Sequence, residues 1–332
     1  MFHWQHLFGI FLFFLGSLGI FFYSYIADFR DSVWDQLQAR SGDKGKTVST
    51  FKKPQLFSSQ SNRPLLFLES DVLSINHDEK DIFFQLPIGY VFDQQGEKIE
   101  YRAALGSFNF SRNILGLKSD VSLNSKASKV SSDQLNYHLD SHYLTGQGRV
   151  TGDYIVPSTQ DNLVISGDKL ESNTLKQTGF FQGNVKGRVT RKRRYEEGVD
   201  FASQRLEFNL LAGRTDLMGD VHLIKENMHA TARQGQLLLE NYNKKLKYFS
   251  LLSDVVVKEK VVDARGNVIY RRALAESLEW FVGDHLVVLS ENPRVYQDSD
   301  TIRGNRIILR ENNSVIEVDD ANSNFKVKKI GQ

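Results

Sequence analysis

The segment FASQRLEFNLLAGRTDLMGDVHLIKENMHATARQGQLLL, residues 201–239, carries the pattern on which the architecture rests. Apolar residues stand two positions apart at Leu206 and Phe208, and again at Leu237 and Leu239. Residues two apart share one face of a β-strand, so each pair predicts a strand with one apolar face. Turn-forming glycine and asparagine residues separate the strands, and no helical period appears. The segment therefore predicts consecutive antiparallel strands.

The same alternation recurs from about Leu65 onward. In each unit, one strand carries either a pair of apolar residues or a single one, and we expect these side chains to form a continuous apolar interior. The predicted interior residues are Phe108, Phe110, Leu135, Tyr137, Leu170, Leu206, Phe208, Leu237, Leu239, Leu278, Trp280, Ile307 and Leu309. The residues between them, such as Asn136 and Glu207, are mostly polar and are expected to face water.

A second recurring feature is a small residue, a polar residue and a valine, which we expect to end the other strand of each unit. These valines are Val121, Val150, Val185, Val221 and Val255, and Val295 follows a variant of the pattern. Their unequal spacing predicts turns of different lengths, with hairpin loops at Val189–Val199 and Glu259–Arg271. The repeats together predict an all-β body of about seven two-strand units.

Composition excludes several classes of function. The 332 residues hold 42 Lys and Arg against 40 Asp and Glu, without the excess of basic residues expected of a nucleic-acid-binding protein. There are no cysteines, which excludes disulfides and thiolate sites. The eight histidines lack zinc-type spacing, and no nucleophile elbow, P-loop or dinucleotide-binding glycine motif occurs. We therefore predict no enzyme, no catalytic residue, no metal and no cofactor.

The N-terminus predicts a membrane anchor within residues 1–27, because Leu7–Ala27 carries no fully charged residue and is long enough to span a bilayer as a helix. A cleaved signal peptide is the alternative. It would have a basic residue before a shorter apolar run and small residues after it, whereas Tyr23 and Tyr25 are bulky. Residues 28–63 are expected to form a short juxtamembrane helix and a polar linker.

Two parts of the chain resemble lipopolysaccharide-transport proteins. Residues 1–190 resemble the LptC family in having an anchor, a linker and the segments SSDQLNYHLDSHYLTGQGRVTGDY and VISGDKLESNTLKQTGFFQGNVKGRV. Residues 200–327 resemble the OstA/LptA-type domain, especially in residues 201–239 and in RGNRIILRENNSVIEVDDA. The exported part is longer than in a typical LptC.

The resemblance implies an elongated antiparallel β-jelly roll of two facing sheets. We assign an LptC-like jelly roll to residues 64–190 and an LptA/OstA-like extension to residues 200–330, with a break near 191–200. The implied function is that of a periplasmic bridge component, which accepts lipopolysaccharide from the inner-membrane ABC transporter and passes it along an apolar groove. The predicted interior residues would line that groove and contact the lipid.

The resemblance also implies the partners. The transporter subunits would contact helix 7–27 and the N-terminal strands at about Leu65–Ile75. An LptA-like periplasmic protein would pair with an edge strand at about 321–328. No nucleic acid is expected as a partner.

The implied localisation is the inner membrane, with a single-pass anchor and the bulk of the chain in the periplasm. The basic residues that follow the anchor, Arg30 and Arg40 among them, would by charge counting alone place the body in the cytoplasm. The alternative function is a membrane-tethered β-repeat scaffold with a closed core, which binds proteins or envelope polysaccharide.

Overall fold

The computed structural model describes residues 49–60, 63–75, 81–92, 96–126, 128–155, 160–192, 198–239, 246–262, 266–281, 284–297, 300–310 and 316–319. It divides into two units, Met1–Thr50 with Ser74–Asp78, and Phe51–Leu73 with Glu79–Gln332, and the second unit holds most of the described residues. The predicted anchor, most of the linker and the predicted edge strand at 321–328 lie outside the described residues. Within the described residues, no helix has the length and hydropathy needed to cross a bilayer.

All regular structure in the described residues is β-strand, which confirms the predicted all-β class. The strands are β1 (Ser49–Lys52), β2 (Gln55–Gln60), β3 (Arg63–Glu69), β4 (Val72–Ile75), β5 (Asp81–Gln85), β6 (Ile88–Phe92), β7 (Lys98–Arg102), β8 (Leu105–Asn109), β9 (Ile114–Asn124), β10 (Ser128–His138), β11 (Tyr143–Ile155), β12 (Asn162–Asn173), β13 (Thr178–Thr190), β14 (Val199–Asn209), β15 (Arg214–Lys225), β16 (Met228–Leu239), β17 (Leu246–Val262), β18 (Val268–Phe281), β19 (Leu286–Ser290), β20 (Arg294–Gln297), β21 (Asp300–Arg303), β22 (Arg306–Arg310) and β23 (Ile316–Asp319).

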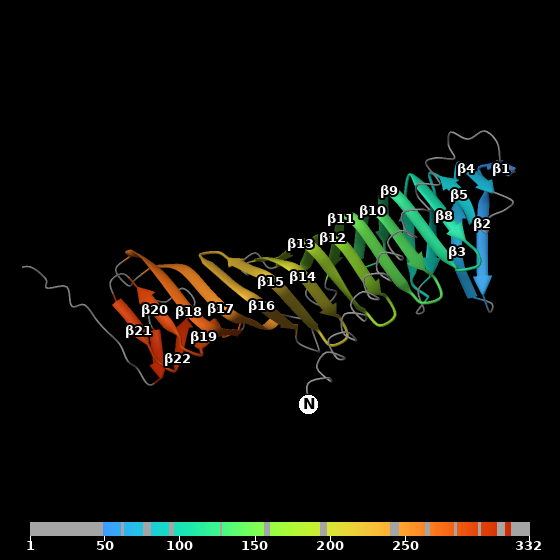
Figure 1. The fold of residues 1–332 in the computed structure, drawn as a ribbon. Helices are drawn as coiled ribbons and strands as arrows, with labels where there is room; N and C mark the ends of the chain where they lie inside the picture. Colours follow the sequence, from blue (N-terminus) through green and yellow to red (C-terminus); the bar gives the residue numbers. More distant parts are fainter. Residues whose placement is uncertain are drawn as a thin grey trace, which may run out of the picture. The chain divides into compact units, whose positions relative to one another are not determined.

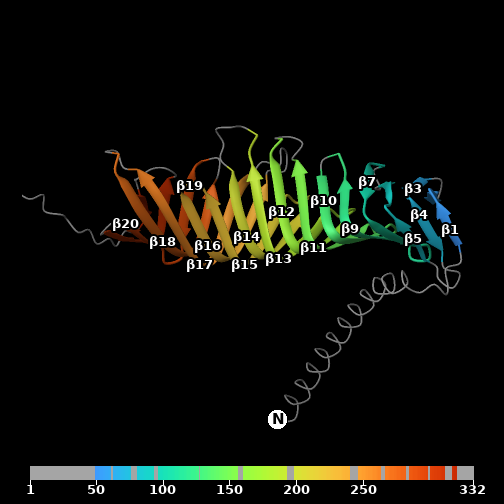
Figure 2. The same ribbon diagram turned by 90° about the horizontal axis from the view of Figure 1, so that it is seen from above.

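The long strands β9 to β18 pair antiparallel in sequence order, each with the next. Figure 1 shows them side by side, and Figure 2 shows the same order from above. The ladder of β13 and β14 closes at the pair Val189↔Val199, so the strands before and after residues 191–197 belong to one sheet.

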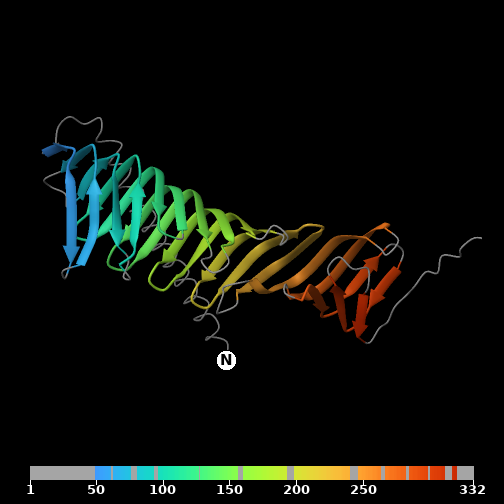
Figure 3. The same cartoon turned by 180° about the vertical axis from the view of Figure 1, so that it is seen from behind.

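Each long strand contributes to two layers. At the N-terminal end, the first half of β9 pairs with β8 and its second half pairs with β7. At the C-terminal end, β18 likewise pairs with β19 through one half and with β20 through the other. We call the layer that contains β5, β8, β19, β22 and β23 layer A, and the layer that contains β2, β3, β6, β7, β20 and β21 layer B. The long strands are visible from behind in Figure 3.

Each long strand bends from one layer into the other at a corner, and the backbone there is left-handed in the odd-numbered strands. Two consecutive residues have positive φ in the odd-numbered long strands, as at Gly148 and Arg149 (68° and 44°) or Gly219 and Asp220 (73° and 46°). The hydrogen-bond register shifts at the same place, for example between Gln147 and Val150. A bulge of this kind bends a strand without ending it.

The recurring valines mark these corners. Val121, Val150, Val185, Val221, Val255 and Val295 are all between 0% and 2% exposed. They fall on β9, β11, β13, β15, β17 and β20, so the repeat of two strands per unit is confirmed through β17. The prediction that these strands end at the valine was wrong, because pairing resumes after the bulge. The predicted loop at Glu259–Arg271 was also mostly wrong, since β17 and β18 pair as far as Val262↔Val268.

Candidate lipid-contacting interior

Apart from Phe110 and Leu239, the predicted interior residues lie in layer A, on the face turned toward layer B. Ten of them are 9% exposed or less: Phe108, Leu135, Tyr137, Leu170, Leu206, Leu237, Leu278, Trp280, Ile307 and Leu309. Cross-strand pairing aligns them, because Leu135 faces Leu117 on β9 and Gly146 on β11, which in turn faces Leu170 on β12. The alternation in the sequence therefore produces one apolar row across successive strands.

Three of the predicted residues differ from the rest. Phe110 is 49% exposed, so its predicted burial was wrong. It follows the end of β8 and stands in a turn, where the Asn109 side chain accepts a hydrogen bond from the Arg112 amide at 2.8 Å. Phe208 is half-buried, and its ring centroid lies 6.3 Å from that of buried Phe181. Leu239 belongs to β16, but its side chain is not among those described.

Layer B supplies the opposite wall, which the sequence pattern did not single out. Its buried apolar side chains include Val199, Phe201, Leu223, Val257 and Ala273. Contacts between the layers show that the two faces enclose one interior. A β-carbon at Gly152 in layer B would lie 3.3 Å from the Phe181 ring in layer A, and the Lys225 ammonium from layer B lies 4.7 Å from the Trp280 ring centre in layer A.

Trp280 is the bulkiest residue of the interior and is 1% exposed. It pairs across strands with Phe249, and the two rings meet edge to face with centroids 6.4 Å apart. Its indole N–H has no hydrogen-bond partner among the described residues. A buried donor without a partner costs about 1–3 kcal/mol, so this site would gain from a guest that brings an acceptor oxygen.

A charged pair also lies inside layer B. Arg271 donates to the Glu259 carboxylate at 3.2 Å, and the two side chains are 1% and 8% exposed. Arg271 also donates to Gln297 at 3.3 Å. Burial lowers the pKa of Arg271, and the Glu259 charge opposes that shift. Both residues fall in the loop predicted at 259–271, and the signal that could have placed them inside is their two-residue spacing from buried Val257, Val261 and Ala273.

The outer face of layer A beside Phe208 carries a pocket of about 320 Å³. Phe180, Arg205, Glu207 and Asp216 contribute to its lining, together with Phe208. The Arg205 guanidinium lies 3.8 Å from the Phe180 ring centre and pairs with Glu207 at 2.8 Å. Phe208 is thus the predicted lining residue that stands at the boundary between the interior and the surface.

Two of the described histidines contact nearby tyrosines. His142 Nδ1 lies 3.1 Å from the Tyr137 hydroxyl, and His138 contacts the Tyr143 ring. In the part of the chain that the structure describes, no three histidine, aspartate or glutamate side chains come together as metal ligands would.

Comparison with known proteins identifies the family. Residues 17–190 match the family described as lipopolysaccharide-assembly, LptC-related, and residues 200–315 match the LptA/(LptD N-terminal domain) LPS transport protein family. Neither is a family of enzymes. No curated protein matches the chain.

Among solved structures, the chain is similar to LptH from Pseudomonas aeruginosa, the LptA-homologous periplasmic component of the conserved lipopolysaccharide transport device. The two share 13% identity at a TM-score of 0.34, over 39% of this chain and 95% of that one. The LptC match spans more than half of the 332 residues, and the second match begins after it, at residue 200. The chain therefore belongs to the LptC-related lipopolysaccharide-assembly family and carries an LptA-like part after its LptC-like part.

Proposed function

We propose that the chain is a bridge component that accepts lipopolysaccharide from the inner-membrane ABC transporter and passes it between layers A and B toward the outer membrane. The observation that carries this proposal is the apolar row that continues across the LptC-like and LptA-like parts without a break in strand pairing. The families that the chain matches are lipopolysaccharide-assembly and transport families.

The chemistry of the cargo fits such an interior. Exposing an acyl chain to water costs about 0.8 kcal/mol per CH₂ group, so a lipid that crosses an aqueous compartment needs a continuous apolar shelter. The lining residues are buried against one another, so an acyl chain would enter only where the layers part. We propose that Phe208 contacts acyl chains at such a place and that Trp280 contacts them deeper inside.

The proposed partners follow from the ends of the sheet. Residues 7–27 would anchor the chain in the inner membrane and contact transporter subunits together with strands β3 and β4. Residues 321–328 would continue the sheet beyond β23 and pair with an LptA-like periplasmic protein. An unpaired strand edge offers main-chain donors and acceptors to such a partner. The body would lie in the periplasm.

The substitution Phe208→Asp tests the proposal. A carboxylate at the half-buried rim should leave a folded protein with a cooperative melt, while lipopolysaccharide reaching the outer membrane falls sharply in cells that depend on this chain. The matched change Glu207→Asn, one residue away on the opposite face, should leave transport unchanged. A folded Phe208→Asp variant with normal transport would contradict the proposal.

The burial of the lining favours one alternative, a membrane-tethered scaffold whose closed core binds no lipid. Leu206, Leu289 and Ile307 are 0% exposed, as expected of a packed core. On that reading, Phe208→Asp would change stability alone.

A further inference from the structure

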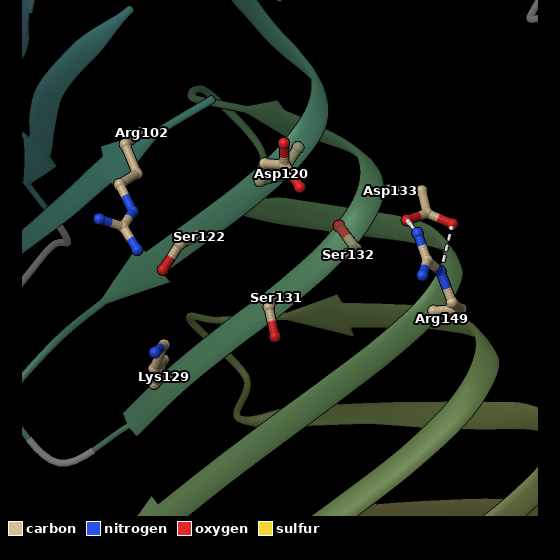
Figure 4. Close-up of a pocket in the computed structure, with 9 residues that line it drawn as sticks. Arg102, Asp120, Ser122, Lys129, Ser131, Ser132, Asp133 and Arg149 are labelled. Atoms are coloured by element: carbon tan, nitrogen blue, oxygen red, sulfur yellow. Dashed lines mark hydrogen bonds and ion pairs between the residues drawn. The ribbon is translucent and has the colours of Figure 1, made fainter. Parts of the chain in front are cut away.

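A polar pocket of about 350 Å³ lies on the outer face of layer B, where β7, β9, β10 and β11 meet at the corner. Arg102, Ser122 and Ser131 are cross-strand neighbours in that order, so their side chains share one face. Lys129 stands two residues before Ser131 and shares the same face. Figure 4 shows these four side chains on adjacent strands. Val121, the buried neighbour of Ser122, points the other way, into the interior.

The pocket contains donors that nothing in the described structure satisfies. Ser122 is 4% exposed, and its hydroxyl has no hydrogen-bond partner. The Arg102 guanidinium and the Lys129 ammonium form no hydrogen bond or ion pair with any described residue. Buried polar groups in folded proteins are nearly always paired, so the Ser122 hydroxyl marks a position for an acceptor, and the exposed cations of Arg102 and Lys129 stand beside it.

The other charges of the pocket set the kind of acceptor. Arg149 is neutralised by Asp133, to which it donates at 2.8 and 3.2 Å (Figure 4). This leaves two unpaired cations, Arg102 and Lys129, against the carboxylate of Asp120. Guanidinium and ammonium groups with serine hydroxyls are the donors that bind phosphate, and a carboxylate at the rim accepts a hydroxyl of the group that carries the phosphate.

We propose that this pocket binds a phosphate monoester carried by a hydroxylated group. Arg102, Lys129 and the Ser122 hydroxyl hold the phosphate oxygens, and Asp120 accepts from the carrier. The site lies on the face opposite the apolar interior, so it is separate from the lining proposed for acyl chains. The ester belongs either to a soluble sugar phosphate or to a lipid headgroup.

Calorimetric titration of the detergent-purified full-length chain tests the site, with glucose 1-phosphate as the soluble probe and glucose as its uncharged counterpart. The wild type should bind glucose 1-phosphate and not glucose. Arg102→Gln should weaken binding about tenfold or more, the loss expected from removing one charge-assisted contact. Arg188→Gln, a change on β13 where the guanidinium pairs with Asp200 at 2.6 Å, should bind as the wild type does.

Ser122→Ala adds a readout that separates ligand binding from folding. Because the hydroxyl has no internal partner, its removal should not lower the melting temperature without ligand. Glucose 1-phosphate should raise the melting temperature of the wild type and raise that of Ser122→Ala less. An equal rise in both proteins would contradict the role of Ser122.

The lipid source is tested with phosphatidylcholine vesicles that contain phosphatidylinositol 4-phosphate, which carries a phosphate monoester on a hydroxylated ring, against vesicles that contain phosphatidylinositol instead. Binding that requires the 4-phosphate and Arg102, without binding of glucose 1-phosphate, assigns the site to a lipid headgroup. Binding of glucose 1-phosphate assigns it to a soluble ester. The inference is overturned if the wild type binds neither probe, or if Arg102→Gln binds both as tightly as the wild type does. Failure of these binding tests would leave the proposal that Phe208 contacts acyl chains unaffected.

Discussion

The ring of Phe208 lies over Gly179, its cross-strand partner, in the space that a side chain at position 179 would occupy. A β-carbon there would lie 2.7 Å from Phe208 Cζ and would also collide with the Glu171 carbonyl oxygen. Gly179→Ala should therefore displace the ring and lower the free energy of unfolding by about 1–3 kcal/mol. Urea denaturation of the purified chain measures this loss.

Gly146→Ala is the matched control. Gly146 also lies in layer A and faces Leu170, but a β-carbon there would meet its nearest atoms at 3.5 Å, an ordinary contact distance. We expect a change well below that of Gly179→Ala. Equal losses in the two variants would show that crowding by the Phe208 ring and the Glu171 carbonyl oxygen is not the cause.

Two equivalent corner positions, one a glycine and the other a serine, allow the cost of left-handed backbone to be tested by exchanging the two residue types. Gly219 on β15 and Ser253 on β17 occupy equivalent positions, with φ of 73° and 66°. A left-handed backbone costs a non-glycine residue about 1–2 kcal/mol. Gly219→Ser should therefore destabilise the chain by about that amount, while Ser253→Gly should be neutral or stabilising. Thermal melting of both variants measures the difference, and destabilisation by Ser253→Gly would argue against backbone strain at the corner.

The buried pair of Arg271 and Glu259 predicts a strong asymmetry between single and double variants. Removal of one partner leaves the other charge buried and unpaired, so Arg271→Met should lower the free energy of unfolding by about 3–5 kcal/mol. The double variant Arg271→Met, Glu259→Leu should recover most of that loss, because no unpaired charge remains. A double-mutant cycle by urea denaturation gives the coupling energy, and additive losses would contradict a coupled pair.

Two stacked histidines on the outer face of layer B predict a pH dependence. His222 Nδ1 lies 3.3 Å from His229 Nε2, and the pKa of His229 is lowered from 6.5 by burial and by the charges of His222 and Lys258. The unfolded chain then binds a proton at His229 more readily than the folded chain does. Stability should accordingly be complete above the unfolded pKa of about 6.5 and fall as the pH drops through that value toward the folded pKa.

His229→Gln should remove this part of the pH dependence. Urea midpoints at about pH 7.5 and about pH 5.5 measure it, because these values bracket the titration of an ordinary histidine. Lys118→Gln, a change on β9 in layer A, is a control that should keep the wild-type dependence. An unchanged slope in His229→Gln would show that His229 does not carry it.

The sequence predicts those features of the fold that depend on the alternation of side chains along a strand. Leu206 and Phe208 stand two apart, so their shared face follows from backbone geometry alone. The difference in burial between Leu206 and Phe208 does not follow from that geometry, because the exposure of Phe208 depends on its place near the end of β14. Phe110 was misplaced for a related reason, since alternation continues into a turn that Asn109 and Arg112 close by a hydrogen bond.

The bends at the corners of the long strands could not be predicted from the sequence pattern. Pairs such as Gly148 and Arg149 are typical of turns, and a continuing strand was recognisable only from the pairing on both sides of the bulge. The division of each strand between layers A and B follows from this bend. The wall formed by layer B, with Phe201 and Leu223, was therefore missed although its residues are apolar and alternate.

Photo-crosslinking in living cells tests most directly whether lipid passes between the two layers. A photoreactive amino acid at Phe208 or Trp280 should form an adduct with lipopolysaccharide, and the same group at Glu207, on the outer face, should not. Adduct formation should require an active transporter. Adducts at Glu207 alone, or at none of the three positions in a folded and complementing protein, would contradict an interior that carries lipopolysaccharide.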